Sequence, residues 1–185
     1  MAKKTTDIRK IVMCAMFTAL ICAGAFIQIP VPPVPITMQT MFVIMAGLML
    51  GSKYGAASAL TYLVLGLAGV PVFTGGGGIT YVFRPSFGFI IGFVFAAFIA
   101  GYIVEKANNF DTKTIAVAAF AGLAVMYVIG CIYMYFILNV YMGLEDRGIS
   151  FVLMNGFLLF MPGEVAKMTL GAVIVRRLKP VLLRT

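Results

Sequence analysis

Long apolar runs, separated by short polar or turn-forming links, dominate the pattern of this chain. A membrane-spanning helix needs about 20 predominantly apolar residues, and most of these runs approach or exceed that length. The runs cover residues 8–29, 38–50, 56–69, 87–104, 113–141 and 150–175, with an interruption near Pro162 in the last. The pattern therefore predicts an all-α, polytopic membrane protein, a six-helix bundle that forms one domain over residues 1–185.

Two of the links are irregular in a way that the residues explain. Four prolines between residues 30 and 35 follow the first run, and they predict a stiff non-helical loop because proline fixes φ and lacks an N–H donor. The second and third runs are short and are separated only by residues 51–55. The sequence leaves two interpretations of these runs open: two separate spans or one re-entrant hairpin.

Composition supports lipid as the solvent and excludes nucleic acid as a partner. The chain is 62% hydrophobic and 11% charged, whereas soluble domains are about half apolar and a quarter charged. The net charge of +8 does not indicate nucleic-acid binding, because the basic residues stand at the ends of apolar runs and not on one polar face.

The lysines and arginines predict an orientation in the membrane. With six spans both termini share a side, and cytoplasmic termini place eleven basic residues inside and two, Arg84 and Arg147, outside. The inner set is Lys3, Lys4, Arg9, Lys10, Lys53, Lys106, Lys113, Arg176, Arg177, Lys179 and Arg184. We therefore expect a multi-pass protein with both termini cytoplasmic, whose proline-rich and glycine-rich loops face outward.

Two ionisable residues, Glu164 and Lys167, interrupt the last apolar run. A charge at mid-membrane costs about 2.5–3.5 kcal/mol on insertion scales, and a spacing of three places both side chains on one helix face. Pro162 suits the first turn of a helix, and a helix that restarts inside the membrane offers free N–H groups. The pair therefore lines a polar cavity and meets a substrate, or else forms an internal salt bridge that only braces the bundle.

A second candidate site is the outward loop that contains Arg84 and Tyr81 together with four consecutive glycines, Gly75, Gly76, Gly77 and Gly78. Glycines let a backbone approach a ligand closely and present N–H groups to an anion. A guanidinium beside aromatic rings suits a ligand that carries a carboxylate. The glycines match no nucleotide-binding motif. The alternative is an ordinary flexible outer loop.

Gln39 and Thr37 are polar residues at the point where the second helix is expected to begin. They could contact a ligand beneath the proline-rich loop. The alternative is ordinary capping of the helix.

A stripe of small residues, Ala15, Ala19 and Ala23, recurs every four residues in the first helix. Small residues at this spacing permit close helix contact. The stripe therefore packs inside the bundle or, if it lies on an outer face, docks a partner. Gly47, Gly51 and Gly55 repeat the same spacing.

The residues that most enzymes and metal sites require are scarce in this chain. It contains no histidine, and its three cysteines all lie in apolar runs without a C-x-x-C pair. We predict no metal, no cofactor and no catalytic residues, so the chain is not an enzyme and cannot itself hydrolyse ATP.

Four segments together resemble the BioY family, the biotin-specific S components of energy-coupling factor (ECF) transporters. They are the proline-rich loop with residues 36–40, residues 69–78, residues 84–88, and the Pro162-Gly163-Glu164-x-x-Lys167 motif. They occur in the family's order over nearly the whole chain. One difference is that aspartate is usual in the family where this chain has Glu164.

The resemblance implies a six-helix S component in a bacterial plasma membrane, with biotin bound near the outer face. It implies a transmembrane coupling subunit and two cytoplasmic ATPase subunits as partners. The docking face for the coupling subunit would be the stripe of Ala15, Ala19 and Ala23. The ligand residues would be Arg84, Glu164 and Lys167, and the two outward loops would act as lids.

These residues also suit the chemistry of biotin. Glu164 could accept a ureido N–H, either cation could meet the ureido oxygen or the carboxylate, and Tyr81 and Phe87 could cover the apolar tail. One cluster of two cations and one acid favours an anionic vitamin over a cationic one such as thiamine. The remaining alternatives are an S component for another vitamin, a small channel or structural subunit, and a membrane enzyme.

Overall fold

The computed structural model describes residues 2–107, 110–144 and 147–183, and most of these residues are helical. The helices are α1 (Ala2–Phe26), α2 (Gln39–Leu67), α3 (Phe87–Ala107), α4 (Thr112–Phe136), α5 (Ile149–Gly156) and α6 (Met161–Leu183). Shorter elements are β1 (Gln28–Ile29), β2 (Ile36–Thr37), η1 (Ile79–Phe83), η2 (Ile137–Tyr141) and η3 (Leu158–Phe160). The predicted all-α class is confirmed. Arg184, one of the expected inner cations, lies outside the described residues.

Five helical segments of the described chain, not six, are long and apolar enough to cross a membrane. The expected second and third spans form one element, α2, broken only at Gly51, where φ is 83°. The two arms of α2 fold back on each other, because a Cβ atom at Gly55 would lie 2.6 Å from Cα of Gly47. Residues eight apart in a straight helix are separated by about 12 Å. The six-helix count is thus not confirmed, because one glycine reverses the chain without a separating loop.

The interruption expected near Pro162 lies slightly earlier in the chain. Phe157 leaves the helical region with φ −132° and ψ −66°, and the short turn η3 leads into α6. Pro162 therefore occupies the first turn of α6, where its missing N–H costs nothing. The restart places Glu164 in the first turn of the new helix and Lys167 in the second.

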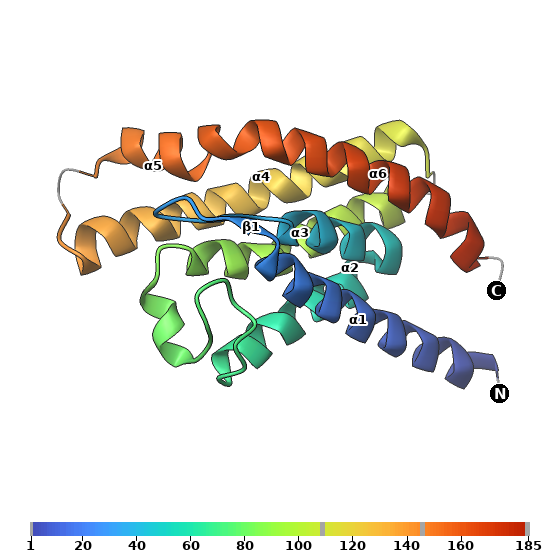
Figure 1. The fold of residues 1–185 in the computed structure, drawn as a ribbon. Coiled ribbons are helices and arrows are strands. Elements are labelled where there is room, and N and C mark those ends of the chain that lie inside the picture. The colour runs from blue at the N-terminus through green and yellow to red at the C-terminus, as the bar shows by residue number, and fades with distance from the viewer. Residues whose placement is uncertain (1, 108–109, 145–146, 184–185) are drawn as a thin grey trace.

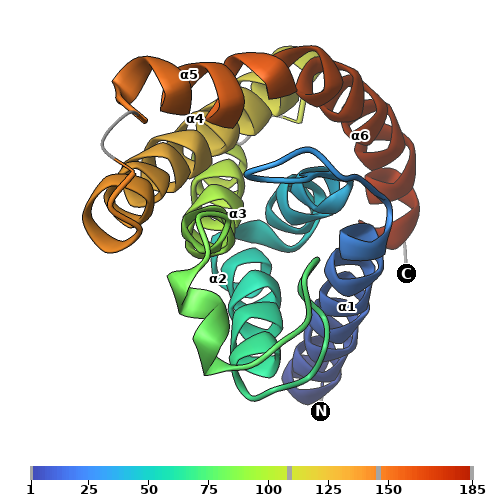
Figure 2. The same ribbon diagram turned by 60° about the vertical axis from the view of Figure 1, so that its left-hand side comes forward.

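The helices surround a short β-hairpin that the proline-rich loop forms. Helix α3 packs between α2 and α4, α1 lies along α2, and α6 covers α2 and α4. The hairpin pairs Gln28 with Thr37 and Ile29 with Ile36. It crosses the middle of the ring of helices (Figure 2). Helix α1 begins and α6 ends at one end of the molecule, and the hairpin tip and the glycine-rich loop lie toward the other end (Figure 1).

The alanine stripe lies on the outer face of α1. Ala15, Ala19 and Ala23 are all exposed, whereas Phe17 and Ile21 on the opposite face are buried against the bundle. Internal packing therefore does not explain the stripe, and the face that it forms is open to a partner or to lipid.

Candidate functional site

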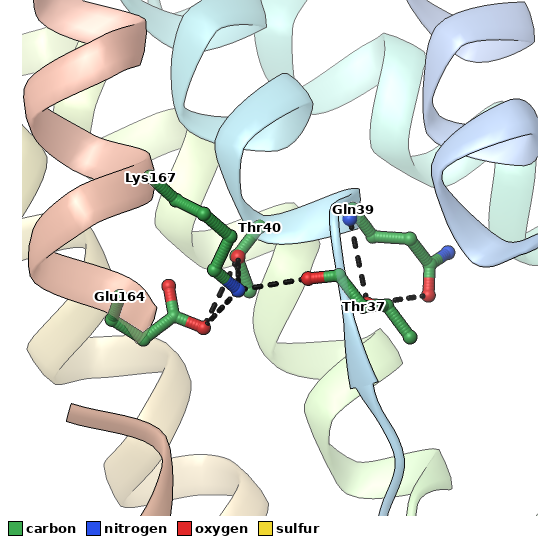
Figure 3. A network of polar contacts seen from close by, with 5 residues as sticks. All are labelled: Thr37, Gln39, Thr40, Glu164 and Lys167. Atoms are coloured by element: carbon green, nitrogen blue, oxygen red, sulfur yellow. Dashed lines mark hydrogen bonds and ion pairs between the residues drawn. The ribbon is translucent and has the colours of Figure 1, made fainter. Parts of the chain in front are cut away.

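Glu164 and Lys167 form an ion pair inside the bundle (Figure 3). Nζ of Lys167 lies 2.5 Å from Oε1 of Glu164, and the two residues are only 7% and 1% exposed. Lys167 also donates to Oγ1 of Thr40 and to the carbonyl oxygen of Thr37, each at 2.8 Å. An ammonium group has three donors, so these contacts use all of them. The pair thereby joins α6 to the junction of β2 and α2.

One oxygen of Glu164 has no partner within the described part of the chain. Oε1 accepts from Lys167 and, at 3.2 Å, from Oγ1 of Thr40, while Oε2 is buried without a hydrogen bond. A buried acceptor left unsatisfied costs about 1–3 kcal/mol, and more when it is charged. Glu164 also lines a cavity. Oε2 therefore has room for one donor, and the hydroxyl of Tyr127, which lines the same cavity, is close enough to interact with the Glu164 carboxyl.

The cavity beside Glu164, here called the inner cavity, has a volume of about 40 Å³, which is room for a few waters. Its apolar wall includes the rings of Phe89, Phe93, Tyr127 and Phe160. Its polar wall consists of Thr37, Gln39, Thr40, Thr74, Tyr81, Ser86 and Glu164. A mostly aromatic pocket with a few convergent polar groups is typical of small-molecule sites.

A larger space, here called the outer cleft, lies between the proline-rich and glycine-rich loops and has a volume of about 470 Å³. It shares the side chains of Pro35, Thr74, Tyr81 and Ser86 with the inner cavity, so these four residues separate the two spaces. The hydroxyl of Tyr81 contacts those of Thr74 at 2.9 Å and Ser86 at 3.3 Å. The partition between the two spaces is thus a small hydroxyl network.

Arg84 lines the outer cleft and not the inner cavity. Its guanidinium carbon lies 5.1 Å from the centre of the Tyr81 ring, which is a cation–π contact. A Cβ atom at Gly75 would lie 2.0 Å from Nη1 of Arg84, so only glycine lets the guanidinium rest there. The structure therefore separates the two cations that the sequence grouped with one acid: Lys167 is paired at the inner cavity and Arg84 lies at the mouth.

The other three glycines line neither cavity. Gly76 and Gly78 have φ of 113° and 102°, a region that other residues rarely adopt. A Cβ atom at Gly77 would lie 2.3 Å from the carbonyl oxygen of Val70. Their placement accounts for the shape of the loop, and a direct contact between them and a ligand stays a prediction.

Gln39 lines the inner cavity, but its amide is already engaged with the protein. Nε2 donates to the hydroxyl of Tyr62 at 2.6 Å and to the carbonyl oxygen of Ile21 in α1 at 3.4 Å. The backbone N–H of Gln39 donates to Oγ1 of Thr37 at 3.4 Å, a weak capping contact. Gln39 therefore both borders the cavity and connects the start of α2 to α1.

The aromatic residues that line the inner cavity differ from Phe87, which the sequence suggested as a cover for the biotin tail. Phe87 packs on Tyr133, with ring centres 5.8 Å apart, and lines neither cavity. Phe89 and Phe93, farther along α3, face the inner cavity instead. Tyr127 was not predicted, because nothing in the apolar run of α4 distinguishes it from its neighbours.

Comparison with known proteins matches this arrangement to one family. The model of the BioY family matches residues 1–184. The chain belongs to the BioY family. A probable biotin transporter BioY from Lysinibacillus sphaericus is 42% identical over 168 residues, which cover 91% of this chain and 85% of that protein. The biotin transporter BioY of Thermotoga maritima is 37% identical, over 92% of this chain and 96% of that protein.

A solved structure agrees with the fold as well as with the sequence. The crystal structure of the S-component for biotin from an ECF-type ABC transporter matches with a TM-score of 0.83 and 31% identity. The match covers 95% of this chain and 93% of that chain. The BioY fold therefore extends over nearly the whole molecule, and the inner cavity lies within the matched fold.

Proposed function

We propose that this BioY family member is the substrate-binding membrane subunit of an ECF-type importer and that its substrate is biotin. The observation that carries the proposal is the free, buried oxygen of Glu164 at one end of an aromatic-lined cavity whose mouth holds Arg84. The carboxylate of Glu164, the aromatic wall of the inner cavity and the guanidinium of Arg84 follow one another from the inside to the mouth. Biotin offers a ureido N–H, an apolar ring and tail, and a carboxylate in the same order.

The order of these groups indicates where each end of biotin binds. The ureido ring lies in the inner cavity, where one of its N–H groups donates to Oε2 of Glu164. The carboxylate lies in the outer cleft near Arg84, which forms bidentate pairs with carboxylates. Lys167 is not a direct ligand in this arrangement, because its three donors already bind Glu164, Thr40 and Thr37.

Entry of biotin requires the partition between the two spaces to move. The inner cavity holds only about 40 Å³, far less than the 300–1,000 Å³ typical of ligand pockets. Tyr81 and Thr74 belong to the partition and are carried by the glycine-rich loop and η1, and Pro35 belongs to the proline-rich loop. These two loops therefore act as lids that part to admit the ligand and close over it.

We further propose that the two arms of α2 count as two membrane-inserted segments, so that six segments place both termini in the cytoplasm. The close approach of Gly55 to Gly47 supports this, as does the common end at which α1 begins and α6 ends (Figure 1). The exposed alanine stripe of α1 then faces a transmembrane coupling subunit, and two cytoplasmic ATPase subunits supply the energy for uptake.

Arg84→Gln is expected to lower the affinity for biotin about tenfold, the loss of one charge-assisted contact. Calorimetric titration of the purified protein with biotin, and with its uncharged amide, tests this assignment. The amide should bind the wild type and Arg84→Gln equally, because it has no carboxylate for Arg84 to meet. Arg147→Gln is the matched control, since its guanidinium lies 4.1 Å from the centre of the Phe151 ring, outside both spaces. Absence of saturable biotin binding to the wild type, or displacement of biotin by thiamine, would refute biotin as the substrate.

Ala19→Trp is expected to block assembly with the coupling subunit and to leave biotin affinity unchanged within about twofold. A large ring on a small-residue stripe prevents close helix contact, whereas Ala19 is exposed on α1 and borders neither cavity. Co-purification with the coupling subunit measures the first effect and biotin titration the second. Val128→Trp, on an exposed position of α4, is the control and should assemble normally. Normal assembly of Ala19→Trp would exclude the stripe as the docking face.

A further inference from the structure

An apolar groove lies on the outside of the bundle between α4 and α6, separate from the inner cavity and the outer cleft. Its volume is about 240 Å³. Ile115, Ala119 and Met168 form its floor and are 1%, 2% and 4% exposed. Phe120 and Val173 form its rims and are half exposed. The groove is thus apolar along its floor and rims, as the binding of a hydrocarbon chain requires.

A cation stands at one end of this groove. Arg176 lines it and donates through Nη1 to Oγ1 of Thr112 at 2.8 Å, a contact that joins the two helices. A guanidinium has five N–H donors, so most of those of Arg176 remain for a partner outside the protein. Within the described ranges no carboxylate forms a salt bridge with Arg176. Lys113 and Arg177 next to this pair are exposed and add to the positive charge.

One acid, Asp111, lies next to Thr112 at the start of α4. Asp111 caps α4, and its Oδ1 accepts from the N–H of Thr114 at 2.7 Å. Hydrogen bonds from the side chain and then from the backbone N–H of Thr114 lower the pKa of the Asp111 carboxyl, and Lys113 lowers it further. Of these charged residues only Arg176 lines the groove, whereas Arg177 is its neighbour in the chain, and Asp111 and Lys113 lie next to Thr112.

The groove is lined by the first part of α4 and by residues 168–176 of α6. The start of α4 and the last turns of α6 lie at the end of the molecule where α1 begins (Figure 1). Under the orientation proposed above this end meets the cytoplasmic leaflet, whose lipids carry negative charge. A purely apolar groove would hold any acyl chain. A guanidinium at its end favours a lipid whose headgroup as a whole carries a net negative charge. We infer that the α4–α6 groove binds an anionic phospholipid, with one acyl chain along the groove and the headgroup phosphate on Arg176.

Native mass spectrometry of the purified protein tests this inference without reference to biotin. The protein is equilibrated with equal amounts of phosphatidylglycerol and phosphatidylcholine that have the same acyl chains. We expect the wild type to retain phosphatidylglycerol preferentially and Arg176→Gln to retain about tenfold less of it. Lys53→Gln removes the same charge from an exposed position outside the groove and should retain the wild-type amount.

A second variant tests the acyl-chain part of the site. Ala172→Phe places a ring in the groove and leaves Arg176 in place, so it should also lower retention of phosphatidylglycerol. Equal retention of the two lipids by the wild type, or full retention by Arg176→Gln, would overturn the inference. The inference would also be overturned if glycerol phosphate displaced the lipid as effectively as added phosphatidylglycerol does, because a free phosphate would then be the ligand. Failure of biotin binding leaves the lipid result intact, so the two proposals can fail separately.

Discussion

Lys167→Ala is expected to lower the affinity for biotin about 100-fold or more, although Lys167 lines neither the inner cavity nor the outer cleft. Removing one partner of a buried ion pair leaves an uncompensated charge, which costs about 3–5 kcal/mol. Without Lys167, the Glu164 carboxyl loses the contact that fixes its orientation, and Oε2 is no longer positioned as an acceptor for the ureido N–H. Biotin titration of the variant, together with its thermal unfolding, measures both consequences.

The double variant Glu164→Gln/Lys167→Met separates a ligand role from a bracing role. Replacing both members of a buried pair by neutral groups is often neutral for stability, so we expect the thermal stability lost in Lys167→Ala to return. Biotin affinity should not return, because an amide at position 164 presents a weaker acceptor than a carboxylate. If the pair only braces the bundle, the double variant will bind biotin like the wild type. Lys53→Ala, an exposed lysine outside both spaces, is the control for loss of one positive charge.

The ion pair itself could be predicted from the sequence, since two charges three residues apart in an apolar run have few other ways to be accommodated. Its surroundings could not. Thr40 comes from a helix that lies 124 residues away in the chain from Glu164, and a threonine in an apolar run carries no signal of what it faces. Glu164 reaches Lys167 and Thr40 with one oxygen, and its other oxygen is buried without a hydrogen bond within the described part of the chain.

The aromatic wall shows the limit of pattern reasoning in a membrane helix. In a soluble helix the polar face marks which residues are buried, but α3 is apolar on every side, so its sequence does not reveal which ring faces inward. Phe87 and Phe89 are both buried, and only the packing of α3 against α4 turns Phe89 into the cavity and Phe87 onto Tyr133. Phe87, suggested from the sequence, and Phe89, which lines the cavity, lie within one turn of each other on α3.

The predicted number of spans was not confirmed, for a related reason. Apolar length predicted the start of α2 and the end of its second arm to within two residues, but the reversal between them depends on the left-handed φ of one residue, Gly51. Glycine permits that conformation and does not require it. The glycine at position 101 completes the junction, since a Cβ atom there would lie 2.4 Å from the backbone N of Ser52.

Gly55→Ala is expected to destabilise the protein by about 2–3 kcal/mol, because overpacking a site that cannot relax carries a cost of this size. The added Cβ would lie 2.6 Å from Cα and 2.8 Å from the backbone N of Gly47, and backbone atoms inside a helix cannot move aside. In a free helix the same substitution stabilises by about 1 kcal/mol. The sign of the effect therefore reports whether the two arms of α2 are in contact, and thermal unfolding in detergent measures it.

Gly163→Ala is the matched control, because Gly163 is also helical and a Cβ atom there would meet nothing within 4 Å. It should leave stability unchanged or raise it slightly. Stabilisation of Gly55→Ala comparable to that of the control would mean that the arms stand apart and that α2 crosses the membrane once. Destabilisation at Gly55 alone means that the chain reverses at Gly51. That reversal brings Tyr62, near the end of the second arm, within hydrogen-bond distance of Gln39, which lines the inner cavity at the start of the first arm. The site then depends on a hairpin whose two arms pack closely because both Gly47 and Gly55 lack a Cβ atom.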